Sequence, residues 1–199
     1  MKKDQRQGTG GHILRIIGGS ARGIRIAAPP TDRTRPTQDR IKESVFNILQ
    51  PYFEGAQVLD LFSGSGSLGL EALSRGAENA VFADESGLCA GIIKDNALKT
   101  GFADKTRVLT LSVDRALTLL ASEGKKFDLI FMDPPYCCNF VSKTLQMLAK
   151  FDIMKEEAII AVEHHQKEAA PEVLEQISRA RVKEYGDTVF SFYIREPQA

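Results

Sequence analysis

From residue 56 onward the sequence alternates short apolar, β-like runs with longer helix-like segments, and this alternation limits the possible folds more than any other feature. The β-like runs are 56–62, 79–83, 106–111, 127–132 and 158–162, and the helical segments are 68–75, 87–100, 114–123, 139–150 and 169–179. A closing hairpin is expected at 181–185 and 189–195. Strands that alternate with helices of this length build a mostly parallel sheet covered on both faces. The sequence therefore predicts an α/β domain over residues 51–199.

The residues before this domain follow a different pattern. Short β-like runs at 14–17 and 23–27 flank turn-forming glycines and predict a hairpin. A helix is expected from Thr37 or Asp39 to about Gln50, just before Pro51. We therefore expect an N-terminal extension over 13–50, whereas 1–12 is predicted to be disordered or left over from an expression vector.

The charge is unevenly distributed along the chain. The 199 residues hold 26 Lys and Arg against 26 Asp and Glu, but residues 1–50 carry +6 and the remaining residues carry −6. A basic arm on an acidic body is typical of a protein that docks on a polyanion. We expect phosphate contacts from five arginines of this arm: Arg15, Arg22, Arg25, Arg35 and Arg40.

Several classes of protein are disfavoured by composition. No apolar run approaches the ~20 residues that span a bilayer, so no membrane segment is expected. The N-terminus lacks the apolar core of a signal peptide, which indicates the cytoplasm. Three cysteines (Cys89, Cys137 and Cys138) are too few for a disulfide scaffold. His164 and His165 point to opposite faces of a strand and have no third ligand in the pattern, so no metal is predicted.

A glycine-rich loop directly follows the first predicted strand of the domain. Gly64, Gly66 and Gly69 match G-x-G-x-x-G between a strand and a helix, and Asp84 stands about 20 residues further on. This pattern alone is typical of a nicotinamide dinucleotide site. Asp60 argues against that ligand, because its carboxylate would repel a pyrophosphate. S-adenosylmethionine carries a sulfonium and an ammonium instead, so we predict that cofactor, with Asp84 on its ribose.

Asp114 follows the third predicted strand and opens a helix. Its carboxylate could contact the adenine amino group of the cofactor. A role as a helix cap is nearly as well supported.

The tetrapeptide Asp133-Pro134-Pro135-Tyr136 follows the fourth predicted strand directly. In an open parallel sheet, ligands bind beyond the carboxyl ends of the strands, near the point where the strand order reverses. Consecutive prolines fix the backbone and donate no hydrogen bond, which leaves the carbonyl near Pro134 free to accept one. The Asp133 carboxylate and that carbonyl would hold an exocyclic amine by its two hydrogens, and Tyr136 would stack on a base. The motif predicts methyl transfer to an amine.

With these motifs the chain resembles the bacterial 16S ribosomal RNA guanine-N2 methyltransferases of the RsmD type, within the class I S-adenosylmethionine-dependent methyltransferases. The resemblance rests on residues 15–25 (RIIGGSARGIR), 35–47 (RPTQDRIKESVFN), 58–76 (VLDLFSGSGSLGLEALSRG) and 127–136 (FDLIFMDPPY). It implies a doubly wound, Rossmann-like, seven-stranded sheet whose final strand is antiparallel. It also implies methylation of one guanine in 16S rRNA, either naked or in the 30S subunit.

The resemblance also assigns residues to roles. It places Asp60, Gly64 and Gly66 at the methionine end of the cofactor, with Asp84 at the ribose and Asp114 at the adenine, and it includes Ser63 among the cofactor-binding residues. It places Asp133, Pro134 and Tyr136 at the target amine. Ser63 stands where Ala is commoner, and Cys137-Cys138 replaces a small or polar pair.

Other functions fit parts of the pattern. A methyltransferase acting on adenine N6 or on a protein glutamine shares the fold, although the glutamine enzymes usually have Asn in place of Asp133. An NAD-dependent oxidoreductase would use the glycines and Asp84 but would leave Asp60 and the tetrapeptide unexplained. A non-catalytic RNA-binding protein with a vestigial cofactor fold is a further alternative.

Overall fold

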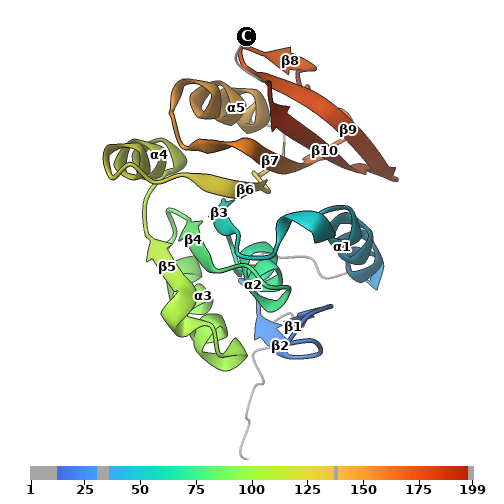
Figure 1. The fold of residues 1–199 in the computed structure, drawn as a ribbon. Coiled ribbons are helices and arrows are strands. Elements are labelled where there is room, and N and C mark those ends of the chain that lie inside the picture. The colour runs from blue at the N-terminus through green and yellow to red at the C-terminus, as the bar shows by residue number, and fades with distance from the viewer. Residues whose placement is uncertain (1–12, 31–35, 137–138, 197–199) are drawn as a thin grey trace, which may run out of the picture.

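A large twisted sheet runs through the protein, with helices on both of its faces (Figure 1). The computed structural model describes residues 13–30, 36–136 and 139–196. The sheet has the strand order β5-β4-β3-β6-β7-β10-β9-β8. Its strands are β3 (Gln57–Leu61), β4 (Asn79–Ala83), β5 (Thr106–Leu109), β6 (Phe127–Met132), β7 (Met154–His165), β8 (Val173–Leu174), β9 (Ile177–Tyr185) and β10 (Thr188–Arg195). The five strands from β5 to β7 are parallel, and β10 runs antiparallel to both neighbours.

Two apolar cores cover the two faces of this sheet. The helices are α1 (Pro36–Ile48), α2 (Ser67–Ser74), α3 (Gly87–Thr100), α4 (Val113–Ser122) and α5 (Phe140–Lys150), with short 3-10 turns at Gln50–Tyr52 and Ala103–Lys105. Side chains of α1, α2 and α3 share one core, whereas α4 and α5 contribute to the other. This arrangement confirms the doubly wound fold. No helix in the described part of the chain is both long and apolar enough to cross a bilayer.

One predicted helix is wrong. Residues 169–179 form no helix; they contain the short strand β8 and the start of β9. β9 pairs with β10 along its length, and the Tyr193 hydroxyl of β10 donates to the Pro171 carbonyl at 2.9 Å. Long-range pairing therefore overrides the local helix propensity of this segment. Because β8 is added, the sheet has eight strands where seven were expected.

The predicted N-terminal hairpin is present as β1 (Ile13–Arg15) paired with β2 (Arg25–Ala27). Buried side chains of this hairpin, among them Ile16 and Ile26, belong to the same core as α1 and α2. The division into a 13–50 extension and a 51–199 domain stays a prediction, and residues 1–12 lie outside the described part of the chain.

Candidate active site

The strand order reverses between β3 and β6, and the two predicted motifs follow these two strands. Asp60 lies beside Phe131 in the β3–β6 ladder and beside Phe82 in the β3–β4 ladder. Asp133 and Asp84 each follow two residues after those partners. Because the strands are parallel, all three carboxylates are at the carboxyl edge of the sheet, around its switch point.

The glycine loop is shaped by two backbone constraints. Gly66 caps the N-terminus of α2 with a φ of 76°, which side-chain-bearing residues rarely adopt. Gly69 packs so closely on β4 that a Cβ would lie 2.4 Å from the Phe82 ring. Phe62, just before the loop, also has a left-handed φ of 59°, and its ring meets that of Phe140 edge-on at 5.6 Å. Such strain in a residue with a large side chain is commonest at functional sites.

Asp60 is 1% exposed, and its Oδ2 accepts a hydrogen bond from the Gly69 amide at 2.9 Å. Burial raises the pKa of Asp60 to about 8, and the nearby Asp84 adds to this effect, whereas the Gly69 amide opposes it. The Asp60 carboxyl group therefore binds the first turn of α2, but no nearby positive charge fully balances its ionised form. Such a group favours a cationic ligand, because a positive charge would stabilise its ionised form.

Asp84 and Ser63 hold the loop from the β4 side. The Asp84 carboxylate accepts from the Gly64 amide through Oδ2 and from the Ser86 amide through Oδ1, both at 2.9 Å. The Ser63 hydroxyl donates to the Asp60 carbonyl at 2.6 Å and also contacts the Ala83 carbonyl at 3.2 Å. The structure thus gives both side chains a loop-forming role. Asp84 is half-buried, and its oxygens keep lone pairs for further donors, because each carboxylate oxygen accepts more than one hydrogen bond.

Asp114 stands in the first turn of α4 and is exposed. Ser112, not Asp114, occupies the N-cap position. A hydrogen bond with Ser112 lowers the pKa of Asp114. Its proposed contact with adenine stays a prediction.

The tetrapeptide after β6 places an exposed Asp133 beside a buried Pro134. Tyr136 is 43% exposed, its hydroxyl donates to Glu163 Oε1 at 3.4 Å, and its ring meets His165 edge-on at 5.8 Å. Burial, together with the charges of Glu163 and Asp133, raises the pKa of Tyr136, so the phenol stays protonated. Cys137 and Cys138 lie outside the described residues.

A buried carboxylate that was not predicted from the sequence joins the hairpin and α1 to the helix that follows the glycine loop. Glu71 of α2 is 0% exposed. Its Oε2 accepts from the Ile17 amide at 2.8 Å and lies 3.0 Å from Lys42 Nζ. Its Oε1 accepts from the Gly18 amide at 2.7 Å and from Arg75 Nε at 2.9 Å. We call these five residues the Glu71 cluster.

The Glu71 cluster reaches the glycine loop through Lys42, whose ammonium also donates to Ser67 Oγ at 2.8 Å. A second connection runs through Asn96 of α3. Its amide donates to the carbonyls of Ser65 and Ala27, and its oxygen accepts from the Ala27 amide at 2.8 Å. The hairpin, α1 and the loop are therefore one bonded unit. An acid inside the apolar run Leu68–Ser74 was the available sequence signal for Glu71.

The predicted RNA-contacting arginines divide into two places. Arg15 and Arg25 are register partners in the hairpin and both are exposed. Arg15 bonds to Asp39 Oδ2, with its Nη2 at 2.6 Å, and its carbonyl accepts from Lys42, so it lies near the start of α2. Arg40 is exposed on α1.

Arg22 is elsewhere: it belongs to the exposed hairpin turn, where Ser20 bonds to Ser74 at the far end of α2. Arg35 lies outside the described residues. The structure therefore groups Arg15 and Arg25 near the start of α2. Arg22 lies about the length of this short helix away, roughly 12 Å.

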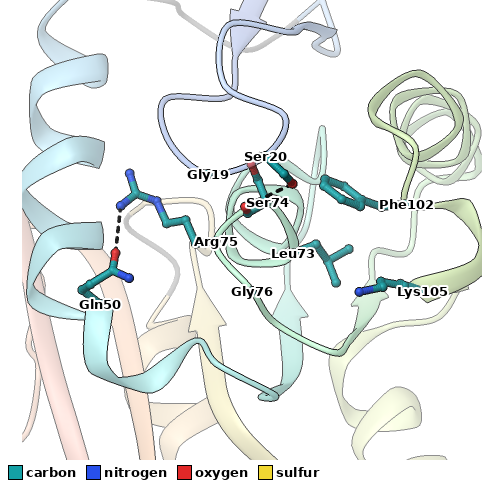
Figure 2. A pocket seen from close by; sticks show the side chains of 9 residues that line it. All are labelled: Gly19, Ser20, Gln50, Leu73, Ser74, Arg75, Gly76, Phe102 and Lys105. Carbon is teal, nitrogen blue, oxygen red and sulfur yellow. Dashed lines mark hydrogen bonds between the residues drawn. The ribbon is translucent and has the colours of Figure 1, made fainter.

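An open hollow of about 450 Å³ lies at that far end of α2, away from the carboxyl edge of the sheet (Figure 2). Arg75 points from α2 toward Gln50, to which it donates at 3.4 Å, and Lys105 extends from the opposite side. None of the predicted site residues lines it.

The two histidines have separate environments. His164 Nε2 lies 2.9 Å from Ser191 Oγ, and burial lowers the pKa of His164. His165 Nδ1 accepts from the Lys167 amide at 3.1 Å. Among the residues that the structure describes, no three His, Cys, Asp or Glu side chains group as metal ligands would.

Comparison with known proteins agrees with this geometry. A family model described as "Conserved hypothetical protein 95" matches residues 14–194. The ribosomal RNA small subunit methyltransferase D of Escherichia coli (strain K12) is 38% identical over 100% of this chain and 97% of its own length. The enzyme of the same name from Haemophilus influenzae is 36% identical over 82% of this chain and 84% of its own length.

The solved structures lead to the same group. The structure of yhhF from Escherichia coli has a TM-score of 0.79 and 35% identity, and the match covers 94% of this chain and 100% of that chain. SMU.776, a chain solved with SAH, has a TM-score of 0.69 at 14% identity and so shows the shared fold. The chain therefore belongs to the conserved hypothetical protein 95 family and to the RsmD-type group of class I S-adenosylmethionine-dependent methyltransferases.

Proposed function

We propose that this protein transfers a methyl group from S-adenosylmethionine to the exocyclic N2 amine of one guanine in 16S rRNA. The observation that carries the proposal is the meeting of two motifs at the switch point. The glycine loop, held by Asp60 and Asp84, follows β3, and Asp133-Pro134-Pro135-Tyr136 follows the adjacent β6. The relatives named as small-subunit rRNA methyltransferases support the substrate class.

The donor set suits this cofactor. Asp60 is a buried carboxyl with no full counter-charge, Asp84 has carboxylate lone pairs near the loop, and Asp114 is exposed in the first turn of α4. When bound, the cofactor supplies a methyl group on a positively charged sulfur. In this proposal Asp60 complements that charge, Ser63 with Gly64 and Gly66 keeps the loop open, and Asp84 binds the ribose.

The remaining residues position the acceptor. Asp133 and the carbonyl at Pro134 accept the two amine hydrogens, which orients the nitrogen lone pair toward the methyl group. Tyr136 supplies a stacking face for the base, a contact worth about 1–3 kcal/mol in other nucleic-acid complexes. Positioning of this kind provides most of the rate enhancement, because the donor is already a strong electrophile.

The N-terminal residues 13–50 would contact RNA in this proposal. Arg15 and Arg25, exposed on the hairpin, and Arg40, exposed on α1, would bind phosphates. Arg22 would reach the RNA backbone further out, and Arg35 keeps its predicted role. The partner is 16S rRNA, free or in a 30S subunit in the cytoplasm, and neither a membrane nor a metal takes part.

The test is transfer of labelled methyl groups to 30S subunits and to naked 16S rRNA from cells that lack the enzyme, followed by mapping of the modified base. We expect one N2-methylguanine. Methylation of adenine or of a protein glutamine would contradict the proposed acceptor. Tight binding of NADH, with none of S-adenosylhomocysteine, would contradict the proposed cofactor.

A further inference from the structure

A second acidic side chain lies beside the tetrapeptide and has no part in the mechanism above. Glu163 belongs to β7, one position beyond Val162, which pairs with Met132 of β6. In this parallel register Glu163 is therefore the neighbour of Asp133. The Tyr136 hydroxyl donates to Glu163 Oε1 at 3.4 Å, and both Glu163 and Asp133 contribute to the raised pKa of Tyr136. Two carboxyl groups from adjacent strands thus act on the same hydroxyl.

Glu163 lies in an environment unfavourable to a structural carboxylate. It is half-buried, and no ion pair involves it among the described residues. Its neighbours are Tyr136 and, across the β7–β10 ladder, the apolar Phe190. Burial raises the pKa of Glu163 to about 7. A carboxyl in such a place lowers the stability of the fold, because its charge is neither solvated nor paired. Groups of this kind are commonest at functional sites, which indicates a role in binding a ligand.

The edges of guanine and adenine differ at the atom next to the amine. Guanine presents N1–H beside its N2 amine, so these two neighbouring groups are both donors. Adenine presents an N1 lone pair beside its N6 amine. A carboxylate next to Asp133 would accept the guanine N1–H, whereas it would face a lone pair on adenine.

We propose that Glu163 is the residue that selects guanine as the acceptor, by accepting the N1–H of the base while Asp133 holds the amine. This inference rests on the proposed function. It assigns Glu163 to base recognition and leaves methyl transfer to the residues already named.

The experiment uses 30S subunits reconstituted with 2-aminopurine at the mapped guanine. This base keeps the N2 amine but has a lone pair at N1. The wild-type enzyme is expected to prefer guanine by about 10- to 100-fold in kcat/KM, the range for a single well-formed base contact. In Glu163→Gln the carboxamide can donate to N1 of 2-aminopurine, so the preference should fall by about tenfold or more.

Glu157→Gln is the matched control, because it changes the same charge on the same strand at an exposed position about 20 Å away. Its guanine preference should equal that of the wild type. Binding of S-adenosylhomocysteine and the melting temperature show whether each variant is folded.

Each outcome decides a separate point. If the wild type methylates no rRNA guanine, the proposed function fails and this inference with it. If it methylates guanine and Glu163→Gln keeps the wild-type preference, the inference alone is overturned. If Glu163→Gln does not fold, the wild-type enzyme still decides: equal rates on guanine and 2-aminopurine would refute a contact to N1–H.

Discussion

Replacing Glu71 by Gln should destabilise the protein strongly, although the side chain keeps its size and shape. The carboxylate accepts from two backbone amides and faces two cationic side chains, Lys42 and Arg75. A carboxamide has one acceptor oxygen, so its NH2 group would face a donor at one of these positions. The variant would also leave the partly buried Lys42 without its nearest anion, and the loss of one partner from a buried pair costs about 3–5 kcal/mol.

The assay is thermal unfolding followed by circular dichroism. For a chain of about this size, 1 kcal/mol corresponds to about 2–4 °C, so we expect the melting temperature to fall by about 6–20 °C. Glu123→Gln is the control, because Glu123 pairs with Arg107 at the surface. That exposed pair should contribute far less, since solvent screens it.

The pH dependence gives a second criterion. Burial alone would raise the pKa of Glu71, but Lys42, the Ile17 amide and Arg75 together lower it below its ordinary value of 4.5. A carboxyl with a lowered pKa stabilises the fold above the unfolded pKa and loses this effect as the pH falls through the folded one. The difference between wild type and Glu71→Gln should therefore shrink in acid. A melting temperature within about 2 °C of the wild type at pH 7, less than 1 kcal/mol by the same scale, would refute the reasoning.

Three further predictions concern the site. Asp133→Ala should lower kcat by at least about 100-fold while binding of S-adenosylhomocysteine, measured by calorimetry, is unchanged; retained turnover would contradict its role. S-adenosylmethionine should bind the wild type more tightly as the pH rises from 6 to 8, because Asp60, with a pKa of about 8, must ionise to complement the cation. Asp60→Asn should bind about 10- to 100-fold more weakly at pH 8 and lose this dependence, and a variant that keeps it would exclude Asp60 as the cause. Arg25→Ala should weaken rRNA binding and reduce the slope of log K against log salt by about 1, whereas Arg107→Ala on β5 should leave the slope unchanged.

The sequence predicted the elements whose local and tertiary preferences agree. The strand Phe127–Met132 and the helix Gly87–Thr100 have the expected bounds, because an apolar strand run and a capped helix carry their own signals. It failed at 169–179, where pairing between β9 and β10 decides the structure. A local pattern contains no information about a partner strand that comes later in the chain.

For the site, the sequence by itself determined which chemical groups come near the ends of which strands: Asp60 within β3 and the glycines after it, Asp84 after β4 and Asp133 after β6. In parallel strands this order alone places the groups at one edge, so their chemistry could be inferred from spacing. Only the tertiary structure decided what surrounds them. Glu71 is bound by the Ile17 amide, 54 positions away in the sequence, and Glu163 by Tyr136, 27 positions away. No local pattern encodes these contacts.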